Sequence, residues 1–221
     1  MTIAVRRRPG LTGNQLKILA MIAMTCDHVG LQLLPQAGYL RIIGRLALPI
    51  YASMIAEGCR HTRDRRAYLL RLAGLGVVCQ VVYFAAMGSL YQCILVTFSL
   101  SVCLIYLADR GSLPGLFLGV AGVFFLCVVL PDLLPGTDFA IDYGLSGVLL
   151  PLLIYKGGIL GLTAGLILLA LAHGGSQWVA LAAVPVLMAY NGQRGKWRIG
   201  KFFYWYYPAH LVVIYLISLV I

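Results

Sequence analysis

Four ionisable side chains suited to acyl-transfer chemistry interrupt two hydrophobic stretches near the start of the chain. Asp27 and His28 lie in the first stretch, and Arg41 and Arg45 lie in the second. A neutral histidine can take the proton of an attacking amine or hydroxyl, and an arginine can stabilise the oxyanion that develops on the attacked carbonyl. These residue types therefore predict transfer of an acyl group from a thioester to an amine or hydroxyl.

The composition indicates that these charges lie in a membrane protein. The chain has 221 residues, of which 61% are hydrophobic and only 11% are charged, and its mean hydropathy is +0.92. A water-soluble domain of this size could not bury so much apolar surface. We expect one all-α domain over residues 1–221, a polytopic bundle of transmembrane helices. The formal net charge of +10 reflects membrane topology, so no nucleic acid is expected as a partner.

Hydrophobic stretches of about 20 residues, enough to cross about 30 Å of hydrocarbon, predict nine membrane spans. The first begins with a capping box formed by Thr12 and Gln15. The sixth to eighth are short and interrupted by Gly and Pro, which predicts steep, broken or re-entrant helices enclosed by longer neighbours. The expected ranges are about 14–34, 38–59, 67–88, 90–108, 113–131, 142–155, 158–173, 176–190 and 202–221.

The basic residues predict which side of the membrane each loop faces. Cytoplasmic loops are enriched in Lys and Arg, and nine alternating spans place every Lys and Arg except Arg41 and Arg45 at one side. The opposite side carries the acidic segment 131–138, which is followed by Asp142. We therefore expect a cytoplasmic N-terminus whose first span is retained, and a C-terminus on the far side of the membrane.

The four intramembrane residues are expected to lie near one layer, in the outer half of the membrane. At 1.5 Å per residue, His28 lies about 22 Å from the cytoplasmic end of its helix, and Arg45 reaches about the same depth. Arg41 is expected on the same face of the second helix, about 6 Å further out. Asp27 and His28 are adjacent, so they point about 100° apart and cannot easily bond to each other. We expect Asp27 to neutralise Arg41 or Arg45, which leaves His28 as the base.

Further residues are expected to complete this site or to bind the acceptor. Asp142 and Tyr143 open the sixth span and are expected to close the layer from outside, while His210 in the last span approaches it from the other side. The aromatic run that includes Tyr207 also fits a membrane-interface belt, in which His210 would be a packing residue. Glu57 either pairs with a nearby arginine or acts on a substrate.

A group of residues at the cytoplasmic surface is a candidate binding site for a phosphorylated nucleotide. Arginine forks bind phosphate, and an indole can stack on a base. Lys17 shares a helix face with His28, which offers a path for an extended cofactor arm. The basic loops are also typical of topology signals that meet anionic lipid. The group comprises Lys17, Arg60, Arg63, Arg66, Lys196, Trp197 and Arg198.

The six cysteines all lie inside apolar runs and lack the CxxC spacing of metal and redox sites. We therefore expect buried thiols, neither disulfides nor metal ligands, and no metal cofactor.

Several motifs follow one another in a fixed order along the chain. DHVG at 27–30 precedes LRIIGRLALPIYA at 40–52, DYG occupies 142–144, and an aromatic run ends in YPAH at 207–210. In this order the motifs resemble those of the TraX family, named for the conjugative F-pilin acetylation protein, and the resemblance covers nearly the whole chain. One departure is Gln92, where members of the family often have Asn.

The resemblance implies a multi-span acetyltransferase of the bacterial inner membrane, similar in logic to the acyltransferase-3 enzymes. Such a protein takes acetyl-CoA from the cytoplasm and modifies an acceptor on the other side. The resemblance implies that His28 is the catalytic histidine and that Arg41 and Arg45 handle the acyl donor. The implied acceptor is a pilin-like peptide N-terminus, a sugar or a lipid head group.

Two other functions fit the same residues. Buried charges also form cargo sites in small transporters and lipid exporters, although no internal repeat is evident here. A non-enzymatic chaperone for a membrane peptide is the second alternative. Asp27, His28, Arg41 and Arg45 also fit a purely structural role, as an ion-pair cluster that joins two helices.

Overall fold

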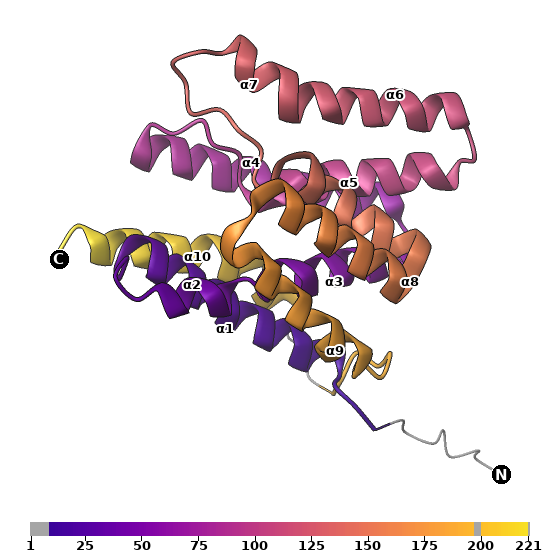
Figure 1. The fold of residues 1–221 in the computed structure, drawn as a ribbon, viewed down its shortest axis with the longest axis horizontal. Coiled ribbons are helices and arrows are strands. Elements are labelled where there is room, and N and C mark those ends of the chain that lie inside the picture. The colour runs from indigo at the N-terminus through magenta and orange to yellow at the C-terminus, as the bar shows by residue number, and fades with distance from the viewer. Residues whose placement is uncertain (1–8, 197–199, 221) are drawn as a thin grey trace. The chain divides into compact units, whose positions relative to one another are not determined.

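The computed structural model describes residues 9–196 and 200–220, and over these ranges the chain is helical, without a β-strand (Figure 1). The predicted all-α fold is therefore confirmed. The chain divides into two compact units. Unit 1 comprises Met1–Tyr51 and Ala182–Ile221, and unit 2 comprises Ala52–Leu181.

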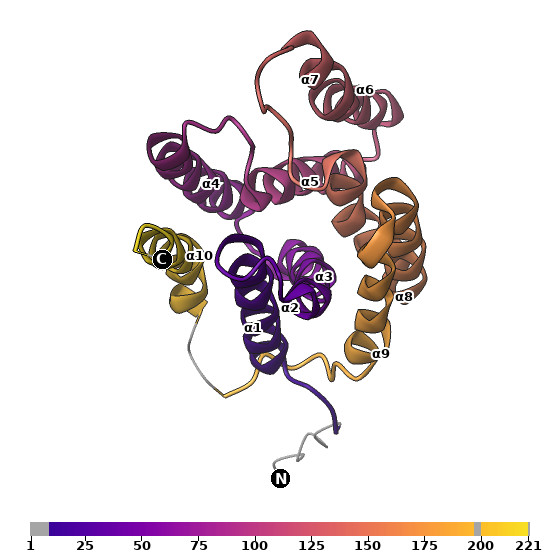
Figure 2. The same ribbon diagram turned by 60° about the vertical axis from the view of Figure 1, so that its left-hand side comes forward.

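Unit 1 is built around α1 (Gly13–Gln32). This helix packs against α2 (Gly38–Gly44) and against α10 (Gly200–Ser218), as Figure 2 shows. The predicted capping box starts α1: the Thr12 N–H donates to Gln15 Oε1 at 2.8 Å, and the Gln15 N–H donates to Thr12 Oγ1 at 3.4 Å. The first span expected at 14–34 therefore corresponds to α1.

The segment after α9 (Ala183–Met188) returns to the start of α1. The N–H groups of Gly13 and Asn14 donate to the backbone carbonyls of Gln193 and Arg194, at 2.8 Å and 3.0 Å. These donors belong to the first helical turn, where no carbonyl of the helix itself can reach them. The loop before α10 therefore completes the hydrogen bonding of α1.

The second expected span, 38–59, is interrupted. α2 ends at Gly44, and α3 (Ala47–His61) begins after a break at Arg45 and Leu46. Pro49 explains the break, because it lacks an N–H and its ring collides with the carbonyl four residues earlier, which is that of Arg45. Arg41 and Arg45 therefore do not share one continuous helix face, which corrects the expectation from their spacing.

Unit 2 is centred on α5 (Ile94–Asp109), which packs against three helices of the same unit. The helices around α5 are α4 (Arg65–Met87), α6 (Leu113–Phe124) continued by η1 (Phe125–Val129) and α7 (Leu130–Leu133), and α8 (Gly144–His173), which is followed by η2 (Gly175–Ala182). The π-helical turn η1 joins α6 to α7, because Pro131 in α7 offers no N–H and α-helical bonding cannot continue unbroken.

The α8 segment reverses direction near its centre. Gly158 has φ 56° and ψ −130°, a conformation outside the helical region that glycine adopts without strain. A Cβ on Gly165 would lie only 2.6 Å from Leu150 Cδ1, although these residues are far apart along the chain. They meet because residues 159–173 run back along residues 144–157. α8 is therefore a hairpin of two helices.

Each half of the α8 hairpin is short for a membrane span. A half of this length rises about 21–23 Å, less than the roughly 30 Å of hydrocarbon. A Cβ on Gly161 would collide with the Leu153 carbonyl oxygen, so glycine permits this close approach of the two helices. The hairpin agrees with the expectation of short helices at 142–155 and 158–173.

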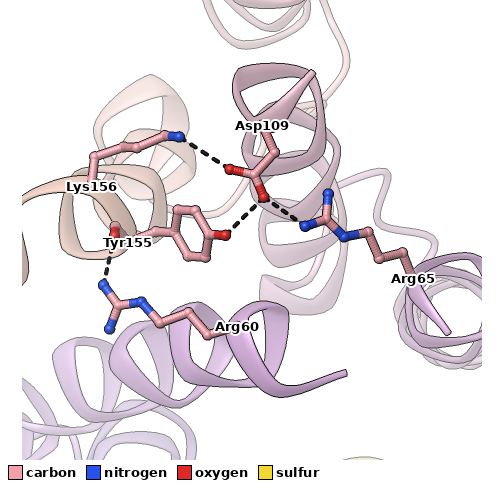
Figure 3. A network of polar contacts seen from close by, with 5 residues as sticks. All are labelled: Arg60, Arg65, Asp109, Tyr155 and Lys156. Atoms are coloured by element: carbon pink, nitrogen blue, oxygen red, sulfur yellow. Dashed lines mark hydrogen bonds and ion pairs between the residues drawn. The ribbon is translucent and has the colours of Figure 1, made fainter. Parts of the chain in front are cut away.

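The carboxylate of Asp109 ties the end of the first α8 half to α4 and α5 (Figure 3). It accepts hydrogen bonds from Arg65 Nη2 at 2.8 Å, from the Tyr155 hydroxyl at 2.7 Å and from Lys156 Nζ at 3.1 Å. These contacts bring Arg65 and Lys156 together at one end of unit 2. The sequence assigns both residues to the same side of the membrane.

Arg60 holds the same end of the hairpin from α3. Its Nη2 donates to the backbone carbonyls of Ile154 and Tyr155, at 3.0 Å and 2.6 Å. The last carbonyls before a helix end have no donor within their own helix, and the reversal at Gly158 creates such an end. Arg60 therefore satisfies acceptors that the hairpin leaves open.

By length and apolar composition alone, four helical segments of the described chain are sufficient to cross a membrane: Gly38–His61, Arg65–Met87, Leu113–Leu133 and Gly144–His173. The first of these is interrupted at Arg45, and the last is the α8 hairpin. Exposed side chains on α6, such as Leu113, Phe117 and Leu118, suit contact with lipid. The chain is therefore built as a membrane protein, while the count of nine crossings stays a prediction.

We expect Asp109→Asn to lower the free energy of unfolding by about 1–2 kcal/mol, because the amide loses the charge that three donors share. Thermal unfolding of the detergent-solubilised protein measures this change. The matched control is Asp132→Asn, which removes an exposed carboxylate at the start of α7 and should change stability by less than about 0.5 kcal/mol. Equal stability of the two variants would contradict the role given to Asp109.

Candidate active site

Two histidines from opposite ends of the sequence meet inside unit 1. His28 Nδ1, from α1, lies 2.7 Å from His210 Nε2, from α10. The ring centroids are 5.0 Å apart and the ring planes differ by 19°, so the two rings are nearly coplanar and meet edge to edge through these nitrogens. His210 is only 7% exposed. The structure therefore brings His210 to His28, as the sequence predicted.

Aromatic side chains hold the His210 ring in place. The Tyr206 ring stacks on it at 5.2 Å with an angle of 6°, and the Tyr207 ring meets it edge-on at 5.5 Å. The Tyr206 hydroxyl lies 2.5 Å from the Thr25 hydroxyl, so the aromatic layer is tied back to α1. The contact of Thr25 was not predicted from the sequence, and Tyr206 was expected only as part of an aromatic belt. The spacing of Thr25 and His28 was the available signal, because Thr25 lies one helical turn before His28 on the same face of α1.

An ion pair lies beside the histidines. Arg41 Nη1 contacts Asp27 Oδ2 at 2.6 Å, and the charge of Arg45 also acts on this carboxylate. The predicted pairing of Asp27 with an arginine is therefore confirmed for Arg41. Gly44 packs directly against the Asp27 side chain, and any Cβ at this position would collide with it.

One oxygen of the ion pair is not satisfied within the part of the chain that the structure describes. Asp27 Oδ1 is buried and has no hydrogen-bond partner there. A buried carboxylate oxygen normally accepts at least one hydrogen bond, because leaving it unpaired costs free energy. This oxygen therefore retains an unused capacity to accept a hydrogen bond.

Asp142 and Tyr143 belong to a separate group in unit 2. Asp142 accepts a hydrogen bond from the Tyr91 hydroxyl at 2.8 Å. Tyr143 adopts a left-handed backbone conformation, with φ 57°, and its ring lies 5.8 Å from that of His173. These contacts fix both residues at the start of α8. Their predicted closure of the His28 layer stays a prediction.

The residues predicted to hold a nucleotide have different surroundings. Arg60 is occupied by the α8 carbonyls, whereas Arg63 and Arg66 are exposed at the start of α4. In unit 1, Lys17 is half-buried on α1 and Lys196 is exposed. Trp197 and Arg198 lie outside the described residues. Glu57 is half-buried on α3, in unit 2.

The arrangement in unit 1 combines a base with cationic groups in a buried setting. An imidazole can accept a proton, and guanidinium groups can stabilise a developing negative charge. The stabilisation of a developing negative charge is stronger where water is excluded. The site is therefore equipped for attack on a carbonyl, and it lies on α1, α2 and α10.

Comparison with known proteins supports one family. A probable fimbrial assembly protein FimC, serogroup H1, of Dichelobacter nodosus is 27% identical over 90% of this chain and 93% of its own length. An uncharacterised protein of Rickettsia prowazekii (strain Madrid E) is 58% identical over 36 residues, which are 16% of this chain and 14% of that protein. No solved structure matches the chain. The TraX protein family matches residues 12–218, a range that includes all three helices of the candidate site, and the chain therefore belongs to the TraX family.

Proposed function

We propose that the chain is a membrane acetyltransferase. It moves an acetyl group from cytoplasmic acetyl-CoA to an amine or hydroxyl in the outer half of the membrane. The observation that carries this proposal is the buried contact of 2.7 Å between His28 and His210, beside the ion pair of Asp27 and Arg41. Membership of a family associated with pilin acetylation supports the same reaction.

In the proposed reaction, His28 removes a proton from the acceptor nitrogen or oxygen. That atom bonds to the thioester carbonyl carbon, and the carbonyl oxygen becomes an oxyanion stabilised by Arg41 or Arg45. When the oxyanion collapses, the carbon–sulfur bond breaks and the sulfur leaves with the proton that His28 holds. The products are an acetylated acceptor and free CoA, and His28 returns to its neutral form.

Asp27 has two roles in this proposal. Its Oδ2 holds the Arg41 guanidinium, which fixes the position of the positive charge. Its unpaired Oδ1 accepts a hydrogen bond from the incoming acceptor group. An ammonium, amine or hydroxyl can provide that hydrogen.

We infer that the acceptor is a pilin-like peptide amine, because the relative from D. nodosus is named as a fimbrial assembly protein. A sugar hydroxyl and a lipid head group are the other acceptors to be tested. The name of this relative also fits a second candidate function, a non-enzymatic assembly factor that binds pilin subunits. An acetylation assay separates the two functions.

The nucleotide of acetyl-CoA is proposed to bind one of two basic groups. Arg63 and Arg66 of unit 2 flank the start of α4, where the Asp64 side chain already accepts a hydrogen bond from the Ala67 N–H, so the attraction for phosphate comes from the two arginines. In unit 1 the candidates are Lys17, Lys196, Trp197 and Arg198. Arg60 remains a candidate only if phosphate can replace its carbonyl partners.

We expect His28→Ala to lower the rate of acetyl transfer from labelled acetyl-CoA to a pilin-like peptide by at least about 100-fold, since a general base contributes 10²- to 10⁴-fold. The purified protein in detergent is assayed for labelled peptide and for released CoA thiol. His61→Ala is the matched control, because His61 is an exposed histidine at the end of α3. A His28→Ala variant as active as the control would eliminate His28 as the base, and an inactive wild type would favour the assembly factor.

We expect the paired change Arg63→Gln and Arg66→Gln to weaken CoA binding about tenfold, and the loss to shrink as salt is raised, because the lost attraction is electrostatic. Titration calorimetry at two salt concentrations measures both effects. Arg71→Gln is the control, since Arg71 is an exposed arginine on the same helix whose Nε bonds to the Ala67 carbonyl. If affinity falls only when Lys17 is replaced with Gln, the nucleotide binds unit 1 instead.

A further inference from the structure

The hydrogen atoms of the histidine pair can be assigned from its acceptors. His210 Nδ1 lies 2.9 Å from the Tyr206 backbone carbonyl. A carbonyl oxygen can only accept, so His210 Nδ1 must carry the hydrogen. In neutral His210 the other ring nitrogen, Nε2, is then unprotonated and is a hydrogen-bond acceptor.

The same reasoning continues into His28. Its Nδ1 lies 2.7 Å from His210 Nε2, which in this tautomer can only accept. His28 Nδ1 must therefore carry a hydrogen and donate it. This leaves the lone pair of neutral His28 on Nε2, the nitrogen that faces away from His210.

The opposite assignment requires a charged His210. An imidazolium at this position would donate from both nitrogens, so His28 would accept at Nδ1 and carry its hydrogen on Nε2. His210 is only 7% exposed and sits between the rings of His28, Tyr206 and Tyr207. No described contact of His210 is to a carboxylate, and an unpaired buried cation is costly. The neutral assignment is therefore favoured.

We propose that His210 is a positioning residue that fixes the tautomer of His28. The chain of donors runs from His28 Nδ1 to His210 Nε2, and from His210 Nδ1 to the Tyr206 carbonyl. It makes His28 Nε2 the base that takes the proton of the acceptor. The inference rests on the proposed acetyl transfer for its catalytic consequence, whereas the tautomer itself is independent of any activity.

The geometry also keeps the ring of His28 from turning over. A half-turn of the ring about the Cβ–Cγ bond would place Cδ2 where Nδ1 lies and would break the hydrogen bond with His210 Nε2. The Tyr206 ring stacks on His210 and is tied to α1 through Thr25, so both rings are held by the same pair of helices. The neighbouring aromatic rings therefore fix the orientation of the two histidine rings in addition to burying them.

The first test compares two replacements of His210. The amide oxygen of glutamine reaches about as far as Nε2 and accepts a hydrogen bond, whereas leucine fills space without accepting one. We expect His210→Gln to keep the rate of acetyl transfer within about tenfold of the wild type and His210→Leu to lose about 100-fold or more. The Michaelis constant for acetyl-CoA should change little in both. If both variants lose the rate equally, or both keep it, the positioning role is overturned.

The second test reads the tautomer directly by nitrogen NMR. The chain has four histidines, so the imidazole signals of ¹⁵N-histidine-labelled protein in nanodiscs can be assigned by comparison with single His variants. We expect His28 to be protonated at Nδ1 and unprotonated at Nε2 in the resting wild type at neutral pH. The reverse pattern would overturn the proposal even if acetyl transfer is confirmed. The expected pattern with no transfer would reject the enzyme but retain the assigned tautomer.

Discussion

A polar group inside a hydrocarbon layer must find its partner within the protein, because neither lipid nor water supplies one there. This constraint explains the ion pair of Asp27 with Arg41. At the end of unit 2 that carries the basic residues, helix ends find their partners in the same way: Arg60 donates to carbonyls that the α8 reversal leaves open, and Asp109 accepts from three donors.

The histidine pair does not follow from this constraint alone. The contact between two buried imidazoles uses only one of the two hydrogen-bonding nitrogens of each ring, whereas a pair of apolar side chains would pack there without any desolvation cost. The contact of His28 with His210 is therefore hard to explain by stability and is well suited to proton transfer. The nearby Arg41 adds the positive charge that attack on a carbonyl requires. In a family associated with pilin acetylation, this combination supports acetyl transfer.

Local signals in the sequence were sufficient for features that depend on neighbouring residues. The capping box at Thr12 and the short helices around Gly158 were predicted because caps and glycine breaks act within a few residues. The break at Arg45 was missed, although Pro49 provided the signal, because hydropathy favoured one uninterrupted helix across it. The convergence on Asp109 was not predicted, since it joins three helices that are distant in sequence. The approach of His210 to His28 was predicted from their depth in the membrane alone, and the nitrogen atoms that meet were not predicted.

The central claim is that the thioester carbonyl meets His28 inside unit 1. The most direct measurement is an experimental structure of the protein bound to an acetyl-CoA analogue in which a methylene group separates sulfur from the carbonyl carbon. The proposed function predicts that the carbonyl carbon lies within reach of His28 Nε2 and that its oxygen points toward Arg41 or Arg45. The proposed function would be contradicted if the acyl end bound elsewhere, with no path from it to His28, while His28 and His210 were still in contact.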